Sequence, residues 1–333
     1  MNRTKKRIIH VLFWATALLF SALAWNTATN MILPDASSSA KLPLETQQGN
    51  SCPRILDEIL DAAKAPAGYT VADAETYLGI YQVHGDEIIN PYFETVPSDL
   101  KDEQDDLVTQ QNVWEYFATI IPAQKRGMIS DYLILTDGPD NILAAVSQTR
   151  DDASHWVLEV DIADSTNYAN LTFNMMHEFG HLLTLNADQV PPNMNVFNNP
   201  GNAEVYNQES ALCPNYFPGE GCSQAGSYIN QFYQRFWTNV YPEWTAIHQI
   251  DNQTTYYKKL VEFYEKHEDQ FVSDYAVTSP AEDIAESWAH FIFAPKPEGD
   301  TIAGQKVLFF YDYPELVSLR EEILNRVCSA FPQ

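Results

Sequence analysis

The chain contains 333 residues, of which 45% are hydrophobic and 13% aromatic, so it has enough apolar material for one large domain or two modest ones. This composition excludes an intrinsically disordered protein. The formal net charge is −26, which argues against nucleic acid and against an anionic membrane surface as partners. We interpret the acidity as a source of solubility in an extracellular medium.

The first 24 residues predict export. Basic residues within positions 3–7 precede an uncharged apolar run over positions 8–24, which is the order found in a signal peptide. Positions 22–24 form a small–x–small cleavage site, but the run is also close to the length of a membrane-spanning helix. A cleaved signal peptide and an uncleaved anchor both place the rest of the chain outside the cytoplasm, secreted or at the cell surface. We expect membrane contact only through such an anchor.

Residues 25–51 are rich in Asn, Ser, Thr and Gln and predict a polar linker, which is followed by a folded region over 52–333. Short apolar runs bounded by turn residues predict strands at 79–83, 132–135, 142–146 and 155–162. The last three are expected to be consecutive strands of one sheet. Apolar residues at helical spacing predict helices near 52–60, 113–121, 228–241, 260–266 and 316–327.

The four cysteines predict two disulfides, because an even count in an oxidising compartment favours pairing and allows three connectivities. Cys213 and Cys222 flank a loop rich in Pro and Gly that closes locally. By elimination, Cys52 pairs with Cys328 near the other end of the folded region. No C-x-x-C pair supports a zinc site made of cysteines. We expect the polar stretch around Cys213 and Cys222 to form a pinned wall of a cleft.

One apolar run contains the sequence His177-Glu178-Phe179-Gly180-His181. Residues four apart on a helix lie on the same face, so His177 and His181 present two imidazoles to one point, as a metal ion requires. Glu178 is rotated off that face, where it can reach a water at the metal. This is the H-E-x-x-H arrangement of a zinc hydrolase, in which the Glu acts as general base.

A catalytic zinc takes three protein ligands and a water, so two histidines do not complete the site. The glycine and histidine that the metzincin pattern requires soon after His181 are absent. The best candidate segment is 274–289, where Ser279 is a suitable helix cap and Glu282 and Glu286 lie four apart. One carboxylate can bind the metal while the other accepts a hydrogen bond from a ligand histidine. The spacing alone leaves open which carboxylate does which.

An H-E-x-x-H motif followed by a distant Glu on a second helix resembles the gluzincin branch of the zincin metallopeptidases. Tyr275, seven residues before Glu282, together with the E-x-x-x-E run, is similar to the catalytic domains of anthrax lethal factor-like peptidases and of secreted Pro-Pro endopeptidases. The resemblance covers roughly residues 155–290 and is specific at these two motifs.

The resemblance implies that His177, His181 and Glu282 are zinc ligands, that Glu178 is the base and that Tyr275 points its phenol at the metal. It leaves the second glutamate as the outer partner of a ligand histidine.

For the fold, the resemblance implies a zincin-like α+β domain with a small twisted sheet, an active-site helix and a mostly helical C-terminal lobe. The upper lobe then covers about 52–186 and the lower lobe about 187–333.

The expected function is therefore that of a secreted zinc endopeptidase, acting as a monomer on peptide or protein substrates with Zn²⁺ as cofactor and Glu178 as base. The strand over 156–162, if it forms the sheet edge beside the cleft, would pair with an extended peptide. Two alternatives stay open, namely a zinc amidase that acts on cell-wall peptide cross-links and a non-enzymatic extracellular binding protein that retains a zinc site.

Overall fold

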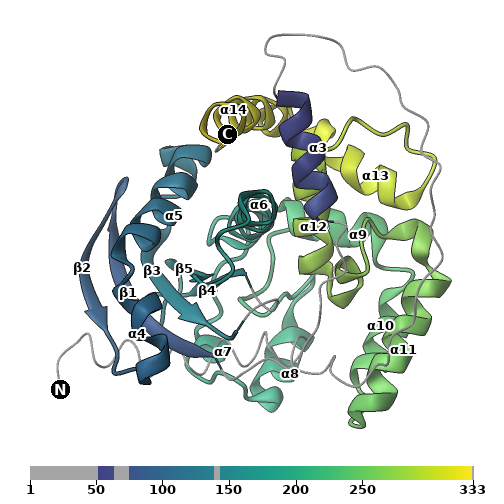
Figure 1. Cartoon of the computed structure of the whole chain (residues 1–333). Coiled ribbons are helices and arrows are strands. Elements are labelled where there is room, and N and C mark those ends of the chain that lie inside the picture. Colours follow the sequence, from purple (N-terminus) through teal and green to yellow (C-terminus); the bar gives the residue numbers. More distant parts are fainter. Residues whose placement is uncertain (1–51, 64–74, 139–142, 332–333) are drawn as a thin grey trace.

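The computed structural model of the chain describes residues 52–63, 75–138 and 143–331. The predicted signal or anchor over 1–24 and the predicted linker over 25–51 lie outside these residues. Across the three described segments, no helix has both the length and the apolar character needed to cross a membrane. A small sheet occupies one side of the molecule and helices occupy the other (Figure 1).

The sheet is mixed and has five strands in the order β2-β1-β3-β5-β4. The strands are β1 (Thr76–His84), β2 (Glu87–Phe93), β3 (Ile129–Thr136), β4 (Ala144–Gln148) and β5 (Trp156–Asp161). Only β3 and β5 run parallel, and the other neighbouring pairs are antiparallel. Four of these strands were predicted from the sequence, and β2 was not.

The sequence does not predict strand β2, because the strand lies at the sheet edge and six of its seven residues are not fully buried. It pairs with β1 through a tight hairpin in which His84 lies opposite Glu87. Gly85 takes a φ of 65° in this turn, a conformation that favours glycine. An exposed strand of this kind needs no alternation of apolar residues, so the sequence carries no periodic signal for it.

The expectation that residues 156–162 form a sheet edge is wrong. All six residues of β5 are buried, and the strand lies between β3 and β4. The physical reason is the parallel pairing of β3 with β5, because parallel neighbours need a crossing connection that returns the chain to the same end of the sheet. Strand β4 runs back within that connection and pairs outside β5, so β4 is the edge.

Helices make up most of the chain after the sheet, as expected, and three more α-helices of the described segments lie before β3. They are α3 (Cys52–Ala63), α4 (Lys101–Asp105), α5 (Leu107–Ile120), α6 (Tyr168–Leu185), α7 (Met194–Phe197), α8 (Ala203–Leu212), α9 (Tyr228–Phe236), α10 (Tyr241–His248), α11 (Gln253–Lys266), α12 (Pro280–Phe293), α13 (Ile302–Phe309) and α14 (Pro314–Ala330). The single helix predicted over 228–241 is divided in two, since α9 ends at Phe236 and α10 starts at Tyr241 with a proline in its first turn. The α+β class, with a small sheet first and helices later, is confirmed.

Helix α6 is the centre of the molecule and lies between the sheet and α12 (Figure 1). Asn167 caps it, accepting a hydrogen bond from the backbone N–H of Asn170 at 3.2 Å. From Leu171 to Leu185 every residue except Asn174 is buried, so the helix has no solvated face. A helix that is buried all round belongs in a core, and its polar residues need partners there.

Two disulfides link the described residues as the elimination argument predicted. Cys52 of α3 is bonded to Cys328 of α14, with Cα atoms 5.2 Å apart, and Figure 1 shows these two helices side by side. Cys213 is bonded to Cys222, with Cα atoms 5.4 Å apart. The first bond closes the folded region end to end, and the second closes a ten-residue loop after α8.

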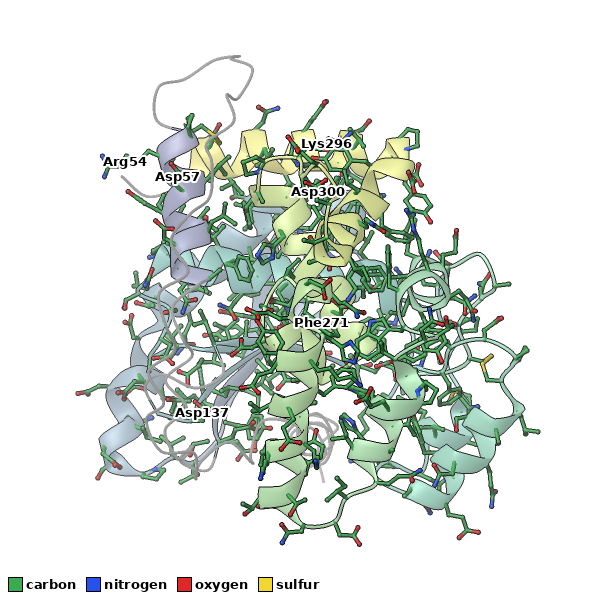
Figure 2. The ribbon with its side chains drawn as sticks, turned by 90° about the vertical axis from the view of Figure 1, so that its right-hand side faces the viewer. Arg54, Asp57, Asp137, Phe271, Lys296 and Asp300 are labelled. Atoms are coloured by element: carbon green, nitrogen blue, oxygen red, sulfur yellow. A yellow bond between two sulfur atoms is a disulfide. The ribbon has the colours of Figure 1, made fainter. Side chains whose placement is uncertain are left out.

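The helical side of the molecule, which faces the viewer in Figure 2, packs through its own aromatic side chains. Phe271 lies deep among these helices and is only 5% exposed, whereas Arg54 and Asp57 of α3 project into solvent. The Phe271 ring contacts Trp237, with centroids 5.6 Å apart. This packing fixes α12, because the fully buried Trp288 belongs to the same continuous core.

Candidate metal centre

Helix α6 brings His177 and His181 together on the side that faces α12. Their Nε2 atoms are 3.1 Å apart, and both side chains are almost fully buried. Two ring nitrogens at this separation point at one position, as residues four apart on a helix allow. The helical spacing read from the sequence therefore gives the observed arrangement.

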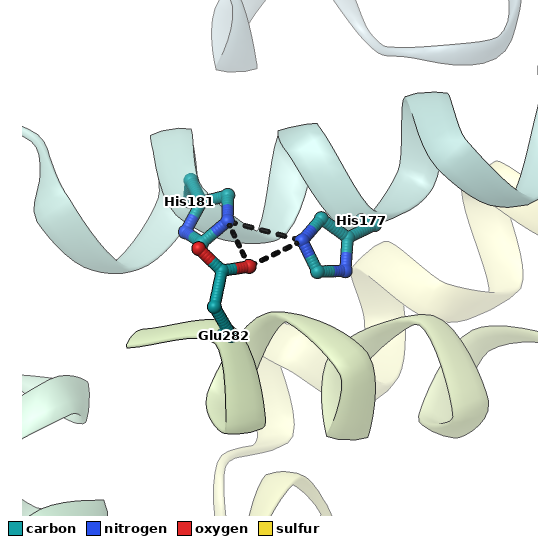
Figure 3. A group of neighbouring side chains, drawn as sticks. All are labelled: His177, His181 and Glu282. Atoms are coloured by element: carbon teal, nitrogen blue, oxygen red, sulfur yellow. Dashed lines mark hydrogen bonds and ion pairs between the residues drawn. The ribbon is translucent and has the colours of Figure 1, made fainter. Parts of the chain in front are cut away.

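Helix α12 supplies a carboxylate to the same position. Ser279 caps the helix, accepting a hydrogen bond from the backbone N–H of Glu282 at 3.1 Å, and Pro280 occupies the first turn. Glu282 Oε2 then lies 2.9 Å from His177 Nε2 and 3.2 Å from His181 Nε2 (Figure 3). The predicted cap and the predicted third residue both take the expected positions.

These three side chains are suited to holding a metal ion, since their ligand atoms all lie within 4.8 Å of one another. The three edges of the triangle they form are 2.9, 3.1 and 3.2 Å. A tetrahedral zinc with bonds of about 2.0–2.1 Å has ligand–ligand edges of about 3.3–3.4 Å, so the triangle needs an expansion of only a few tenths of an ångström. Two imidazoles and one carboxylate are also a donor set that zinc accepts.

The close approach of α6 and α12 depends on Gly180, which stands between the two histidines. A Cβ at this position would lie 3.0 Å from Ala285 Cα and 3.1 Å from Trp288 Cδ1. Both neighbours are fully buried and have no room to move. The missing side chain therefore lets the two helices approach closely enough for Glu282 to reach the histidines.

Glu286 lies one turn further along α12 and contacts His177 on the Nδ1 side of its ring. Its Oε1 is 2.8 Å from His177 Nδ1, and its Oε2 accepts a hydrogen bond from Ser273 Oγ at 2.7 Å. This contact orients the His177 ring with Nε2 toward the ligand position. The Nδ1 atom of His181 is buried and has no such partner among the described residues. The two histidines therefore differ in how firmly their rings are held.

Glu178 lies off the ligand triangle and against the sheet. Its carboxylate accepts a hydrogen bond from the backbone N–H of Val146 in the edge strand β4. Burial raises the pKa of Glu178 to about 7, although His177 and His181 act in the opposite direction. A carboxylate with a pKa near 7 can take up and release a proton near neutral pH.

The histidines and acids of the site hold one another in charged form. Burial lowers the pKa values of His177 and His181, but the carboxylates around them outweigh this effect and raise both above the ordinary value. Burial likewise works against ionisation of Glu282 and Glu286, yet the histidines hold both carboxyl pKa values below the ordinary range. Positive charge is therefore favoured where the three ligand atoms meet, whether protons or a metal ion carry it.

Tyr275 borders the site on the turn that precedes α12. Its ring centroid is 5.7 Å from that of His177, and the side chain is 38% exposed. The turn is held by Ser273, whose Oγ accepts a hydrogen bond from the Ala276 backbone N–H at 3.1 Å while donating to Glu286. One hydroxyl thus connects the Tyr275 turn to the carboxylate behind His177.

All six side chains named from the sequence come together, but two of their supports were not predicted. The Val146 backbone amide lies far from both motifs in the sequence, and Ser273, two residues before Tyr275, carries no periodic or spacing signal. Gly180 was available as a signal, because a glycine inside a buried helix usually marks a close approach.

The interpretation of this site rests on the residues described above, because comparison with known proteins adds no match. No protein-family model matches the chain, and neither a curated protein nor a solved structure matches it.

Proposed function

We propose that the protein is a secreted, zinc-dependent endopeptidase of the zincin type. The observation that supports it best is the convergence of His177 Nε2, His181 Nε2 and Glu282 Oε2 within one buried triangle, with the Glu178 carboxylate beside it at the sheet edge. This combination places a metal position, a base and a strand edge next to one another in space. The two disulfides are compatible with an extracellular protein.

In this proposal zinc, when bound by His177, His181 and Glu282, supplies a Lewis acid that activates water near neutral pH. Glu178 accepts the proton of the attacking water and later delivers it to the leaving amine. The Tyr275 phenol donates a hydrogen bond to the oxygen that becomes negatively charged as the peptide carbonyl is attacked.

The proposed position of the substrate is strand β4 rather than β5. Among the described residues β4 pairs with β5 alone, so its other edge is unpaired there. An extended peptide can add to such an edge through backbone hydrogen bonds. The Val146 N–H, which donates to Glu178, belongs to this strand and fixes the base relative to a peptide bound there.

Two other functions compete with this proposal. An amidase acting on cell-wall peptides would have to hold an anionic polymer on a chain with a net charge of −26. A binding protein that merely retains a zinc site has no need for the buried Glu178 at the strand edge. We expect the protein to act as a monomer on peptide or protein substrates.

The test is digestion of casein, of a mixed peptide library and of cell-wall peptides by the purified protein, with and without o-phenanthroline. We expect internal cleavage that the chelator abolishes and added zinc restores. Cleavage of cell-wall peptides alone would favour the amidase, and no cleavage of any substrate by the zinc-loaded protein would favour the binding protein.

A further inference from the structure

Tyr275 lies in a short turn, Tyr275–Thr278, that leads into α12. Ala276 and Val277 are buried in the core, whereas Tyr275 is 38% exposed. Core packing therefore restrains Tyr275 less than its neighbours, and the backbone of the turn decides where the phenol lies. The proposed role of the phenol needs a fixed position, because a misplacement of about 1 Å can remove most of the effect of a catalytic group.

Side chains hold this turn at both ends. At its start the Ser273 hydroxyl accepts a hydrogen bond from the Ala276 backbone N–H at 3.1 Å. At its end the Trp244 indole N–H donates to the Val277 carbonyl at 3.0 Å. The last carbonyls of a helical turn have no partner within the turn, so an indole from another helix satisfies one of them here. Trp244 belongs to α10, which is separate from the two helices that carry the metal-binding side chains.

The Trp244 indole is itself held by neighbouring rings. The Tyr241 ring stacks on it, with centroids 5.3 Å apart and planes 16° from parallel. The His248 ring lies 3.6 Å from it, and the Nδ1 N–H of this ring donates to the Trp244 backbone carbonyl at 2.9 Å. A planar side chain fixed by such packing keeps its N–H in one direction, as a rigid support requires.

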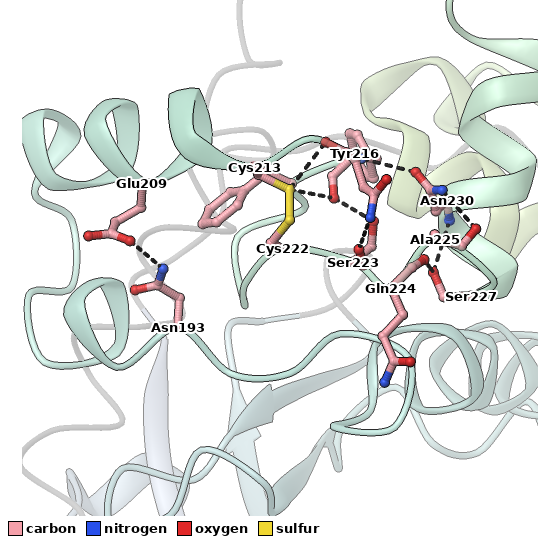
Figure 4. Close-up of a disulfide and its surroundings, with 12 residues drawn as sticks. Asn193, Glu209, Cys213, Tyr216, Cys222, Ser223, Gln224, Ala225, Ser227 and Asn230 are labelled. Atoms are coloured by element: carbon pink, nitrogen blue, oxygen red, sulfur yellow. Dashed lines mark hydrogen bonds between the residues drawn. A yellow bond between two sulfur atoms is a disulfide. The ribbon is translucent and has the colours of Figure 1, made fainter.

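The row of rings continues into the disulfide-closed loop after α8. The Tyr216 ring centroid lies 6.2 Å from that of Tyr241, and the two rings are nearly perpendicular. Figure 4 shows how Tyr216 is held, since its backbone N–H donates to Asn230 at 3.1 Å and its carbonyl accepts a hydrogen bond from the Ser223 hydroxyl. A row of packed rings therefore runs from the disulfide loop through Tyr241 and Trp244 to the turn before α12.

We propose that Trp244 is a positioning residue, whose indole N–H holds the turn so that the Tyr275 phenol stays beside the metal centre. The Tyr275 ring centroid lies 5.7 Å from that of His177, so a shift of the turn changes the distance between the phenol and the metal position. This inference deepens the proposed peptidase function and rests on it.

The test compares Trp244→Phe with Trp114→Phe. Both substitutions remove an indole N–H that donates to a backbone carbonyl, because Trp114 donates to the Asp86 carbonyl in the β1–β2 hairpin at 2.8 Å. In the zinc-loaded protein we expect Trp244→Phe to lower kcat by about 10-fold, with KM and zinc content unchanged. The control Trp114→Phe should leave kcat unchanged.

A double substitution separates positioning from an effect elsewhere in the protein. If Trp244 acts through Tyr275, Trp244→Phe should cause no further loss of kcat once Tyr275→Phe has removed the phenol. Single effects that multiply in the double variant would overturn the proposal.

A second measurement does not depend on cleavage. Fluorotyrosine is incorporated into the protein, and the fluorine NMR signal of Tyr275 is identified by its absence from Tyr275→Phe. The ring lies against His177, so its signal should shift in Trp244→Phe and stay in place in Trp114→Phe. Tyr241→Leu removes the ring stacked on the indole and should shift the signal in the same direction, so it decides the matter if Trp244→Phe does not fold.

An unchanged Tyr275 signal in Trp244→Phe and Tyr241→Leu would overturn the proposal, and so would an unchanged kcat of Trp244→Phe in an active protein. If the zinc-loaded protein cleaves no peptide but the signal shifts in Trp244→Phe and not in Trp114→Phe, the peptidase proposal fails and the support of the turn by Trp244 stands.

Discussion

Glu282 and Asp283 are neighbours on α12, yet they belong to two different buried charge clusters. Glu282 faces α6, where it meets two histidines and no lysine or arginine. Asp283 faces α13, where Lys306 Nζ lies 2.6 Å from its Oδ2 and the Trp237 indole N–H donates to the same oxygen at 2.7 Å. Asp283 is fully buried and the Glu282 side chain is 12% exposed, but of the two only Asp283 forms an ion pair with a lysine or arginine of the described residues.

The difference separates a structural charge from a candidate ligand. Burial raises the pKa of Asp283 to about 6 even with Lys306 beside it, which shows how costly the buried charge is. Its partner ammonium also lies 4.0 Å from the centroid of the Phe271 ring, so the pair is enclosed by aromatic packing. An acid whose counter-charge is built in supports the fold. An acid grouped with imidazoles, without a lysine or arginine, is the one that suits an external cation.

The largest effect should follow from removing the carboxylate of Glu282. Glu282→Ala removes one of three metal-binding side chains, so zinc retention after dialysis against a chelator should be nearly abolished while the fold persists. Zinc content and circular dichroism check this. The control is Glu265→Ala, which removes an exposed acid from α11 and should leave the zinc content unchanged.

The second-largest effect should come from the ion pair between Lys306 and Asp283, on the side of α12 that faces α13. Lys306→Met removes the cation and leaves Asp283 buried with only the indole N–H, which should lower the free energy of unfolding by about 3–5 kcal/mol. Urea unfolding measures it. The comparison is Lys259→Met, which breaks a half-exposed ion pair with Glu262 and should cost far less, because solvent screens this pair. Similar costs for both substitutions would remove the distinction between the two clusters.

A third effect concerns Tyr275, which borders the ligand triangle without belonging to it. Tyr275→Phe removes one hydrogen-bond donor to the developing oxyanion and should lower kcat by roughly 10²-fold. Zinc content and KM should be unchanged, because the ring and the ligands remain. An unaltered kcat would assign the residue to packing against His177.

The smallest effect should come from the contact between Glu286 and His177 Nδ1. Glu286→Ala removes the partner of His177 Nδ1 but no ligand, so zinc affinity should fall by about 10–100-fold and not vanish. Competition with graded chelator concentrations measures this affinity. If Glu286→Ala releases zinc more readily than Glu282→Ala, the assignment of the two carboxylates is reversed.

The comparison also shows which parts of the site the sequence can predict. The pairs His177 with His181 and Glu282 with Glu286 follow from local helical geometry, which needs no knowledge of the fold. The contact of Asp283 with Lys306 joins two helices, and it has no local signature. The support of Glu286 by Ser273, which lies in the turn before α12, likewise carries no periodic signal in the sequence.

In the sheet, too, local patterns could be predicted from the sequence and contacts between distant segments could not. The short apolar runs predicted four strands because each run carries its own signal. Their order in space depends on pairing between distant segments, so the sequence placed β5 at the edge where β4 lies. The exposed strand β2 carries no apolar pattern of its own, so only the structure shows it.

In the proposed mechanism, Glu178 acts on water beside a metal held by His177, His181 and Glu282. The most direct measurement is the turnover of Glu178→Gln on a cleaved peptide, compared with the unsubstituted protein at matched zinc content. We predict one zinc per chain in both proteins and a loss of about 10²- to 10⁴-fold in kcat for the variant, since the ligands remain and the base is gone. Equal turnover of the two zinc-loaded proteins would contradict it.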